Sequence, residues 1–308
     1  CMEQYFIGVD GGGTKTQFVL CGGDGKVLSK IKCGCSNPVN IGVKDCAEIL
    51  RKGISALISQ LSARAHCIIF AGIAGAASGN YKEEIAAFIP ENEKYKLYVG
   101  SDIVNALNAA FGFEDGLAVI GGTGSSCFVR KGNAYFRVGG GGWRLDRGGS
   151  GYAIAVRALD AVLREADGRG AQTCLSAIVA EKYGSFPENL SKIYDLSVEE
   201  VASFAKYVFQ GYESGDEVCV SVLQETAVYM AELVKTGFRV SDLKKRRVAL
   251  VGGLFKDGPL FSMLSAKLPD CNFFVASRPA VLGAALEAVR LGGTKAEKEF
   301  VENFINTF

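Results

Sequence analysis

Residues 8–20, GVDGGGTKTQFVL, place three consecutive glycines beside an acid near the start of the chain. In a dinucleotide-binding fold or a P-loop, a helix follows such glycines directly, because the helix N-terminus receives the phosphate. Here residues 14–21 are rich in β-branched and aromatic side chains, residues 22–25 read as a turn, and residues 26–32 read as another short strand. The pattern predicts an antiparallel meander and disfavours both familiar phosphate loops.

The tip of the predicted hairpin presents backbone N–H groups and the hydroxyl of Thr14, with Asp10 at the end of the first strand. Successive amides in a glycine turn form a concavity that suits an anion. An acid beside a phosphate requires a cation between them, which indicates Mg²⁺. From the loop alone, a phosphate site and a plain glycine turn remain equally open.

The bulk properties favour two domains, since 308 residues are many for one core. The formal net charge of +1 gives no case for a nucleic-acid partner or an anionic membrane. We find no run of eighteen apolar residues and no signal-peptide pattern, and the ten cysteines are scattered as in a reduced core, so we expect a cytoplasmic protein. Cys33 and Cys35 lack the partners of a zinc site, and we expect His66, the single histidine, to be structural.

Further glycine-rich turns follow predicted strands in residues 67–79, 96–112, 116–136 and 247–261. A second hairpin-type loop, residues 121–125, follows the first by about 110 residues. This duplication predicts two related α/β halves that face each other across a nucleotide cleft.

The set of motifs resembles that of the actin, sugar kinase and heat-shock chaperone ATPase superfamily. The motifs are residues 10–14, the strand that ends at Asp102, residues 121–125 and the pair Gly252-Gly253. Within the superfamily the chain resembles the BadF/BadG/BcrA/BcrD ATPase-like family and its N-acetylglucosamine kinase branch, through GCSNPVNIG, GGTGSS, GGSGY and SRPAVLGAALEA. The match runs from about residue 8 to residue 291 and is loose over residues 170–211.

The resemblance implies an α/β protein of two ribonuclease-H-like, actin-like ATPase domains. We expect the first domain over residues 1–113, completed by a C-terminal helix at about 293–308. The second domain is expected over residues 114–292, with a helical insertion at about 152–240. By resemblance, the sugar lies in the cleft between the domains, and ATP lies mainly against the second.

The resemblance also implies that the chain binds ATP with Mg²⁺, and that Asp10 holds the ion through water. The residues expected to bind the nucleotide are Asp10, Gly11, Gly12, Gly13, Thr14, Lys15, Gly122, Thr123, Gly124, Ser125, Gly211, Gly252 and Gly253, with Ala284 nearby.

Asp102 is expected to be the general base, because members of the family carry their catalytic acid after this strand. A carboxylate that accepts the hydroxyl proton suits phosphoryl transfer to a sugar. The alternative is structural, since an acid at the start of the predicted helix commonly serves as its N-cap.

The sugar contacts implied by the resemblance depart from the family pattern at one segment, GGGGWRLDRGGSG at residues 139–151. Relatives carry an acid where this chain has Arg147. Either Asp146 replaces that acid as the hydroxyl acceptor or Arg147 binds a carboxylate, such as the lactyl group of N-acetylmuramate; a plain ion pair between the two is a third option. The residues expected to contact the sugar are Asn37, Asp102, Thr123, Gly140, Gly141, Gly142, Asp146 and Arg147.

We therefore expect an ATP-dependent kinase that phosphorylates an amino sugar, with N-acetylglucosamine at O6 as the first choice. N-acetylmuramate and glucosamine are alternatives within the class. An ATPase of the CoA-reductase or dehydratase activator type is an alternative from another class, although Cys127 lacks the partner cysteine that an iron–sulfur cluster requires. A small-molecule sugar is the expected partner, with neither nucleic acid nor membrane, and the sequence is compatible with a homodimer.

Overall fold

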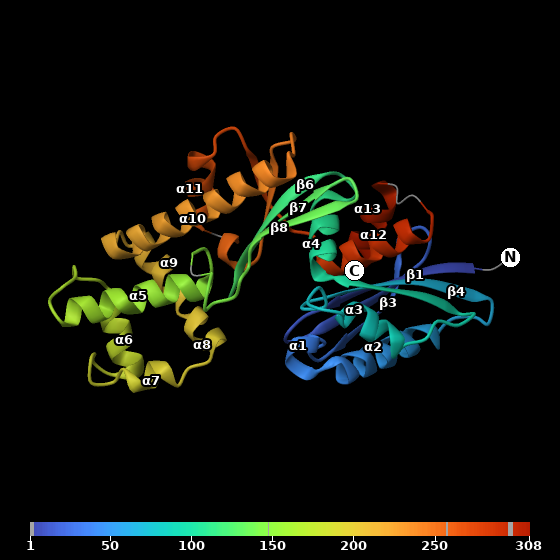
Figure 1. The fold of residues 1–308 in the computed structure, drawn as a ribbon, viewed down its shortest axis with the longest axis horizontal. Coiled ribbons are helices and arrows are strands. Elements are labelled where there is room, and N and C mark those ends of the chain that lie inside the picture. Colours follow the sequence, from blue (N-terminus) through green and yellow to red (C-terminus); the bar gives the residue numbers. More distant parts are fainter. Residues whose placement is uncertain (1–2, 147, 257, 295–297) are drawn as a thin grey trace. The chain divides into compact units, whose positions relative to one another are not determined.

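The structure, a computed structural model, describes residues 3–146, 148–256, 258–294 and 298–308. Within these residues the strands form two five-stranded sheets, and the chain divides into two compact units (Figure 1). The first unit comprises Cys1–Glu114 and Ser277–Phe308, and the second comprises Asp115–Ala276.

The first sheet has the strand order β3-β2-β1-β4-β5. Strands β1, β2 and β3 form the antiparallel meander that the glycine pattern predicted, whereas β4 and β5 run parallel to β1 on its other side. The strands are β1 (Glu3–Gly11), β2 (Thr16–Cys21), β3 (Val27–Cys33), β4 (Ala65–Ile73) and β5 (Tyr95–Ser101).

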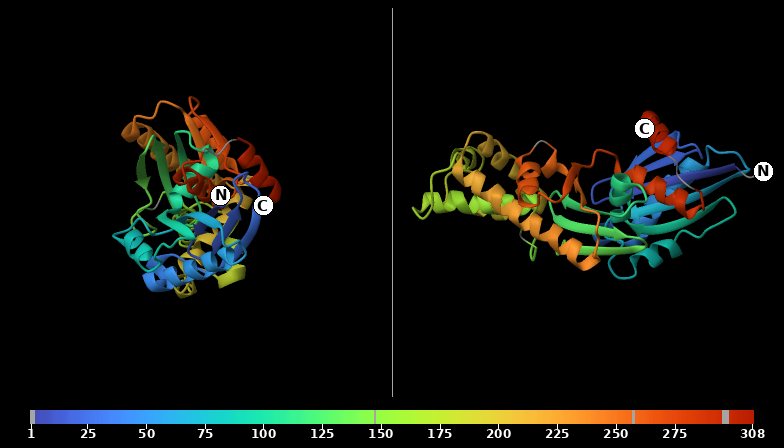
Figure 2. Two further views of the ribbon diagram at one scale, coloured as in Figure 1. Left: turned by 90° about the vertical axis from the view of Figure 1, so that its right-hand side faces the viewer. Right: turned by 90° about the horizontal axis from the view of Figure 1, so that it is seen from above.

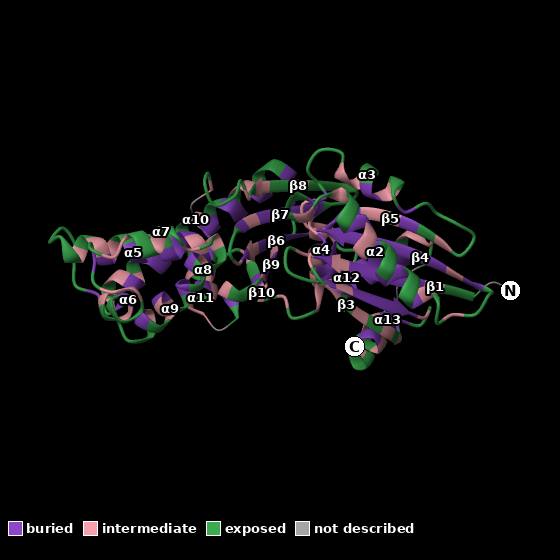
Figure 3. Cartoon of the chain, turned by 90° about the horizontal axis from the view of Figure 1, so that it is seen from below, coloured by how far each residue is buried: buried purple, intermediate pink, exposed green. Residues whose placement is uncertain are grey.

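Alternate residues of these strands face two different helical layers, because side chains alternate along a strand. Ile7 and Ile69 pack against α2 and α3 on one face, and Phe6 and Phe70 pack against α12 and α13 on the other. Figure 3 shows how strongly burial is concentrated on β1, β4 and α12. The helices of this unit are α1 (Pro38–Ile41), α2 (Val43–Ile58), α3 (Tyr81–Ala87), α4 (Asp102–Phe111), α12 (Ala280–Leu291) and α13 (Lys298–Thr307).

Helix α12 follows the second sheet in the chain but packs on β1, β4 and α4 of the first unit. Glycines make this close contact feasible: a Cβ at Gly8 would lie 2.5 Å from the backbone nitrogen of Ala285, and one at Gly283 would lie 1.8 Å from the carbonyl oxygen of Asn105. The first unit therefore includes α12, whereas the sequence placed residues up to 292 in the second domain. Beyond it, α13 contacts β3.

The second sheet repeats the topology of the first, with the order β10-β9-β6-β7-β8. Strands β6, β7 and β8 form an antiparallel meander, and β9 and β10 run parallel to β6. The strands are β6 (Gly116–Gly121), β7 (Ser125–Lys131), β8 (Ala134–Gly139), β9 (Arg247–Val251) and β10 (Asn272–Val275).

Helices occupy the long segment between β8 and β9, and α10 runs alongside β6, β7 and β8 (Figure 2). Within the part of the chain that the structure describes, none of the helices is both long and apolar enough to cross a membrane. The helices of this unit are α5 (Gly151–Ala166), α6 (Leu175–Tyr183), α7 (Ser191–Tyr194), α8 (Val198–Ser203), α9 (Ala205–Glu213), α10 (Glu217–Ser241), the short 3₁₀ helix η1 (Gly253–Phe255) and α11 (Pro259–Lys267).

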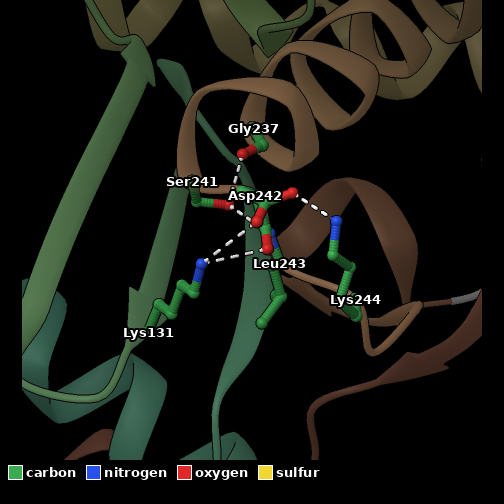
Figure 4. Close-up of polar contacts among 6 residues, drawn as sticks. All are labelled: Lys131, Gly237, Ser241, Asp242, Leu243 and Lys244. Atoms are coloured by element: carbon green, nitrogen blue, oxygen red, sulfur yellow. Dashed lines mark hydrogen bonds and ion pairs between the residues drawn. The ribbon is translucent and has the colours of Figure 1, made fainter.

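The C-terminal end of α10 is tied to the second sheet at Asp242, which adopts a left-handed backbone conformation with φ of 51°. Lys131, at the end of β7, donates to the carbonyl oxygen of Asp242 at 3.1 Å and pairs with its carboxylate at 3.6 Å (Figure 4). Ser241 caps the turn by donating to the carbonyl of Gly237. These contacts fix the point at which the chain leaves α10 for β9.

Candidate active site

Asp10 and Asp102 lie at the same edge of the first sheet. Asp10 is in register with Gly72 of β4, which is in register with Gly100 of β5. Asp102 follows β5 directly as the first residue of α4. Two strand spacings separate β1 from β5, so the two backbone segments are roughly 10 Å apart. The topology thus gathers two acids that are distant in sequence.

Asn105 holds the Asp10 carboxylate. Its buried amide Nδ2 donates to Oδ1 of Asp10 at 2.8 Å and to the carbonyl oxygens of Val9 at 3.3 Å and Gly72 at 3.1 Å. Sequence reasoning missed this residue, although its spacing of three from Asp102 places both side chains on one face of α4. Asn105 therefore links the end of β1 to the helix that carries Asp102.

Burial raises the pKa of the Asp10 carboxyl, and the negative charge of Asp102 raises it further. The hydrogen bond from Asn105 and the positive charge of Lys15 act in the opposite direction. A desolvated carboxylate beside a second acid favours a cation as its neighbour.

The capping role that the sequence left open for Asp102 belongs to Ser101. The Ser101 hydroxyl accepts from the backbone N–H of Ile103 at 3.3 Å and donates to Oδ1 of Asp102 at 3.1 Å. The positive end of the helix dipole favours a negative charge at Asp102. Ser101 thus holds the Asp102 side chain, and Asp102 does not serve as the helix cap.

The first glycine hairpin closes at Gly12, whose N–H donates to the carbonyl of Lys15 at 2.9 Å. At its base, the Thr16 hydroxyl donates to the carbonyl of Gly34 at 2.7 Å and lies 2.8 Å from the hydroxyl of Ser36. The tip residues Gly13, Thr14 and Lys15 are exposed, and Gly11 is buried against Ser36 and Ile73.

The second glycine hairpin is one residue shorter, since it closes at Gly121 and Ser125. The N–H of Gly122 donates to the carbonyl of Gly124 at 2.9 Å, and Thr123 and Gly124 are exposed. The start of α5 supports it, because the N–H of Gly151 donates to the carbonyl of Gly122 at 2.7 Å.

Ser125 stands at the base of this second hairpin, in the position that Thr16 holds in the first. Its hydroxyl oxygen is buried and has no hydrogen-bond partner among the described residues. A buried hydroxyl without a partner is costly, so a ligand that supplies one would bind favourably here.

The other three glycines assigned to the nucleotide differ in how closely their neighbours pack. Gly252 has φ of 112°, and a Cβ there would lie 2.2 Å from the carbonyl oxygen of Gly121, so it permits β9 to end against β6. A Cβ at Gly253 would enter open space within the described structure. Gly211 is buried in α9, where a Cβ would lie 2.4 Å from Sγ of Cys219, which gives this glycine a packing reason.

The loop expected to contact the sugar is organised around Asp146. Its carboxylate accepts from the N–H groups of Gly140 and of Gly141, the latter at 3.2 Å, and from the hydroxyl of Tyr229. Tyr229 was missed by sequence reasoning because it lies 83 residues away in α10. Arg147 lies outside the described residues, and the role assigned to it stays a prediction.

The single tryptophan lies in the same loop. The Trp143 ring is 5.2 Å from that of Tyr152, and the Arg144 guanidinium lies 4.9 Å above the Trp143 ring. These three side chains line a recess of about 460 Å³ together with α5 residues. A sugar or acyl group that entered it would contact an aromatic surface.

Asn37, the remaining sugar candidate, is the N-cap of α1. Its side-chain Oδ1 accepts from the backbone N–H of Val39 at 2.9 Å, as expected for a residue that starts a helix before Pro38. A sugar contact by Asn37 would use its amide Nδ2 or the remaining lone pair of Oδ1.

Comparison with known proteins identifies the family. Residues 7–288 match the model of the BadF/BadG/BcrA/BcrD ATPase family. The chain belongs to this family. The resemblance that the glycine motifs indicated is thereby confirmed.

The relatives within and around the family are named as amino-sugar kinases. An N-acetylmuramic acid/N-acetylglucosamine kinase of Clostridium acetobutylicum is 32% identical over 268 residues, which cover 82% of this chain and 86% of the relative. An N-acetyl-D-glucosamine kinase of Dictyostelium discoideum is 27% identical and covers 93% of this chain and 98% of its own.

Solved structures share the fold. A protein of Chromobacterium violaceum assigned as an N-acetylglucosamine kinase superimposes with a TM-score of 0.75 at 22% identity, over 93% of this chain and 99% of the other. A glucokinase of Streptomyces griseus, solved with glucose and AMPPNP, gives a TM-score of 0.54 at 16% identity. The match covers 93% of this chain and 98% of the glucokinase chain. The expected α/β class, with two sheets of the actin-like ATPase sugar kinases, is confirmed.

Proposed function

We propose that the chain is an ATP-dependent kinase that transfers the γ-phosphate to a hydroxyl of an amino sugar, with N-acetylglucosamine at O6 as the preferred acceptor. The observation that carries the proposal is the placement of Asp10 and Asp102 at one sheet edge, where Asn105, from the helix that Asp102 begins, bonds to Asp10. Asp10 would hold the metal ion that accompanies the phosphates, and Asp102, at a helix N-terminus, would act as the base. The names of the amino-sugar kinase relatives support this assignment.

In the proposed step, the acceptor hydroxyl oxygen forms a bond to the γ-phosphorus while the bond from that phosphorus to the bridging oxygen breaks. Asp102 accepts the hydroxyl proton, and ADP leaves with the electrons of the broken bond. Ser101 acts as a positioning residue, since its hydroxyl bonds to Asp102. General-base assistance of this kind contributes about 10²–10⁴-fold to the rate.

The N–H groups of each exposed hairpin tip, and in the second hairpin the hydroxyl of Ser125, are proposed to bind phosphate. The Asp10 carboxylate suits Mg²⁺ bound through water, because it is a hard oxygen donor that Asn105 holds in place. Magnesium bound with ATP would neutralise charge on the phosphates.

N-acetylmuramate is a second candidate acceptor, favoured by the name of the Clostridium relative. Its lactyl carboxylate would suit an arginine of the loop that contains Trp143. The activator-type ATPase is less well supported: Cys127 is fully buried in β7, and burial raises the pKa of its thiol to about 12.

The test is an ADP-release assay over N-acetylglucosamine, N-acetylmuramate, glucosamine and glucose, with ³¹P spectra to locate the new phosphate ester. We expect sugar-dependent ADP formation, highest with N-acetylglucosamine, and a 6-phosphate product. Background ADP formation with every sugar in a protein that still binds ATP would contradict the kinase assignment. Sugar-independent ADP formation would favour the activator-type ATPase.

A further inference from the structure

A cluster of two thiols and a carboxylate lies in the helical part of the second unit, beside Gly211. The ligand atoms of Cys174, Asp216 and Cys219 all lie within 4.8 Å of one another. Cys174 immediately precedes α6, Asp216 is the N-cap of α10, and Cys219 is in the first turn of that helix.

The carboxylate organises both cysteines. Oδ1 of Asp216 accepts from the backbone N–H of Cys219 at 2.9 Å, and Oδ2 accepts from the N–H of Cys174 at 2.7 Å and from the hydroxyl of Thr173 at 2.9 Å. Outer hydrogen bonds of this kind orient metal ligands before the ion arrives.

Gly211 makes room for the sulfur atoms. A Cβ at this position would lie 2.4 Å from Sγ of Cys219 and 3.0 Å from Sγ of Cys174. Cys219 is buried and Cys174 is exposed, so the cluster has one anchored side and one side open to solvent.

We propose that Cys174, Asp216 and Cys219 form a binding site for a thiophilic divalent cation of the zinc class, with water as the fourth ligand. A tetrahedral ion with metal–sulfur bonds of about 2.3 Å holds its two sulfurs roughly 3.8 Å apart, which the cluster spacing accommodates. As each sulfur–metal bond forms, that thiol releases its proton to solvent. Sulfur ligands select against Mg²⁺, so this ion is distinct from the one that accompanies ATP.

The probe is Co²⁺, whose sulfur-to-metal charge-transfer absorption reports thiolate ligation directly. The full chain, reduced and treated with chelator, is titrated with Co²⁺, and Zn²⁺ is then added as a competitor. We expect a near-ultraviolet charge-transfer band that saturates at one ion per chain and that Zn²⁺ abolishes.

Variants decide which residues bind the ion. Cys174→Ser, at an exposed position that should fold normally, is expected to abolish the band. Asp216→Asn keeps a residue suited to the N-cap and is expected to weaken binding at least about 10-fold. The matched control is the double variant Cys33→Ser/Cys35→Ser, which removes the other close pair of thiols and should keep the band. An absent band in the unaltered chain, or a band that survives Cys174→Ser but disappears in the control, would overturn the proposal.

Discussion

The β1–β2 hairpin and the β6–β7 hairpin occupy the same place in two sheets of the same topology, yet their chemistry differs at the base. The first closes at the pair Gly11–Thr16 and the second at Gly121–Ser125. The Thr16 hydroxyl is engaged with Gly34 and Ser36, whereas that of Ser125 is buried without a partner among the described residues. Each of the two residues pairs with a glycine at the base of its hairpin, so the difference lies in the hydroxyl's partners. The first hydroxyl stabilises the fold, and the second is free to bind the phosphate that we propose for this site.

The helices that follow the last strand of each sheet differ in the same way. Helix α4 begins with Asp102 and has Asn105 as its fourth residue, whereas α12 begins with Ala280 and has Gly283 as its fourth. Helix α4 carries Asp102 and also Asn105, which bonds to Asp10. Helix α12 carries small residues that pack closely against α4. Of these two corresponding helices, only α4 therefore begins with an acid.

The largest effect is expected from removing the acid that only α4 carries. Asp102→Asn should lower kcat about 10²–10⁴-fold, because the amide can no longer accept the hydroxyl proton. Calorimetric affinities for sugar and ATP should change little. Asp45→Asn, at an exposed site in α2, is the control, and near-normal turnover by Asp102→Asn would remove this residue from the mechanism.

Removing each of the two hydroxyls in turn sharpens the comparison of the hairpins. Ser125→Ala should lower kcat/KM for ATP about 10- to 150-fold, since a hydrogen bond to a charged group contributes about 1.5–3 kcal/mol, and should leave the melting temperature unchanged.

Thr16→Val should do the reverse, with a loss of about 1–3 kcal/mol in the free energy of unfolding. Steady-state kinetics and thermal melts of both variants decide the matter. A loss of stability in Ser125→Ala equal to that in Thr16→Val would break the distinction between the hairpins.

The packing role of α12 is tested at Gly283. Gly283→Ala should destabilise the chain by about 1–3 kcal/mol or more, because its Cβ would collide with the backbone of α4. Denaturant unfolding measures the change, with Gly23→Ala as the control, where an added Cβ has nothing within 4 Å in the described structure. Equal stability of the two variants would show that α12 does not approach α4 so closely.

The smallest effect is expected from the pH dependence of Asp10. Burial raises the pKa of this carboxyl, so the folded chain binds the proton more tightly than the unfolded chain does. Ionisation therefore costs stability as pH rises through the raised pKa, and this cost is absent below about pH 4. Asp10→Asn should raise the melting temperature at neutral pH in EDTA and change it little at acid pH; the same change at both pH values would contradict this interpretation.

The sequence was sufficient for the meander, the two glycine loops, the family and the amino-sugar kinase class. These depend on local signals: glycines that fix turns, β-branched residues that follow them, and motifs in a fixed order. It was sufficient to single out Asp102 as an acid after a strand. It did not decide whether Asp102 is a general base or the N-cap of the helix, and the structure assigns the N-cap to Ser101.

The sequence alone determined where the strands and turns lie, because those follow from each residue's backbone preference and its near neighbours. Only the tertiary structure brought Asn105 to Asp10, Tyr229 to Asp146 and Cys174 to Cys219. Those pairs are separated by 45 to 95 residues, and their contacts depend on how parallel strands and packed helices return the chain to the same place. The fold, and not local preference, therefore decided which side chains can act together.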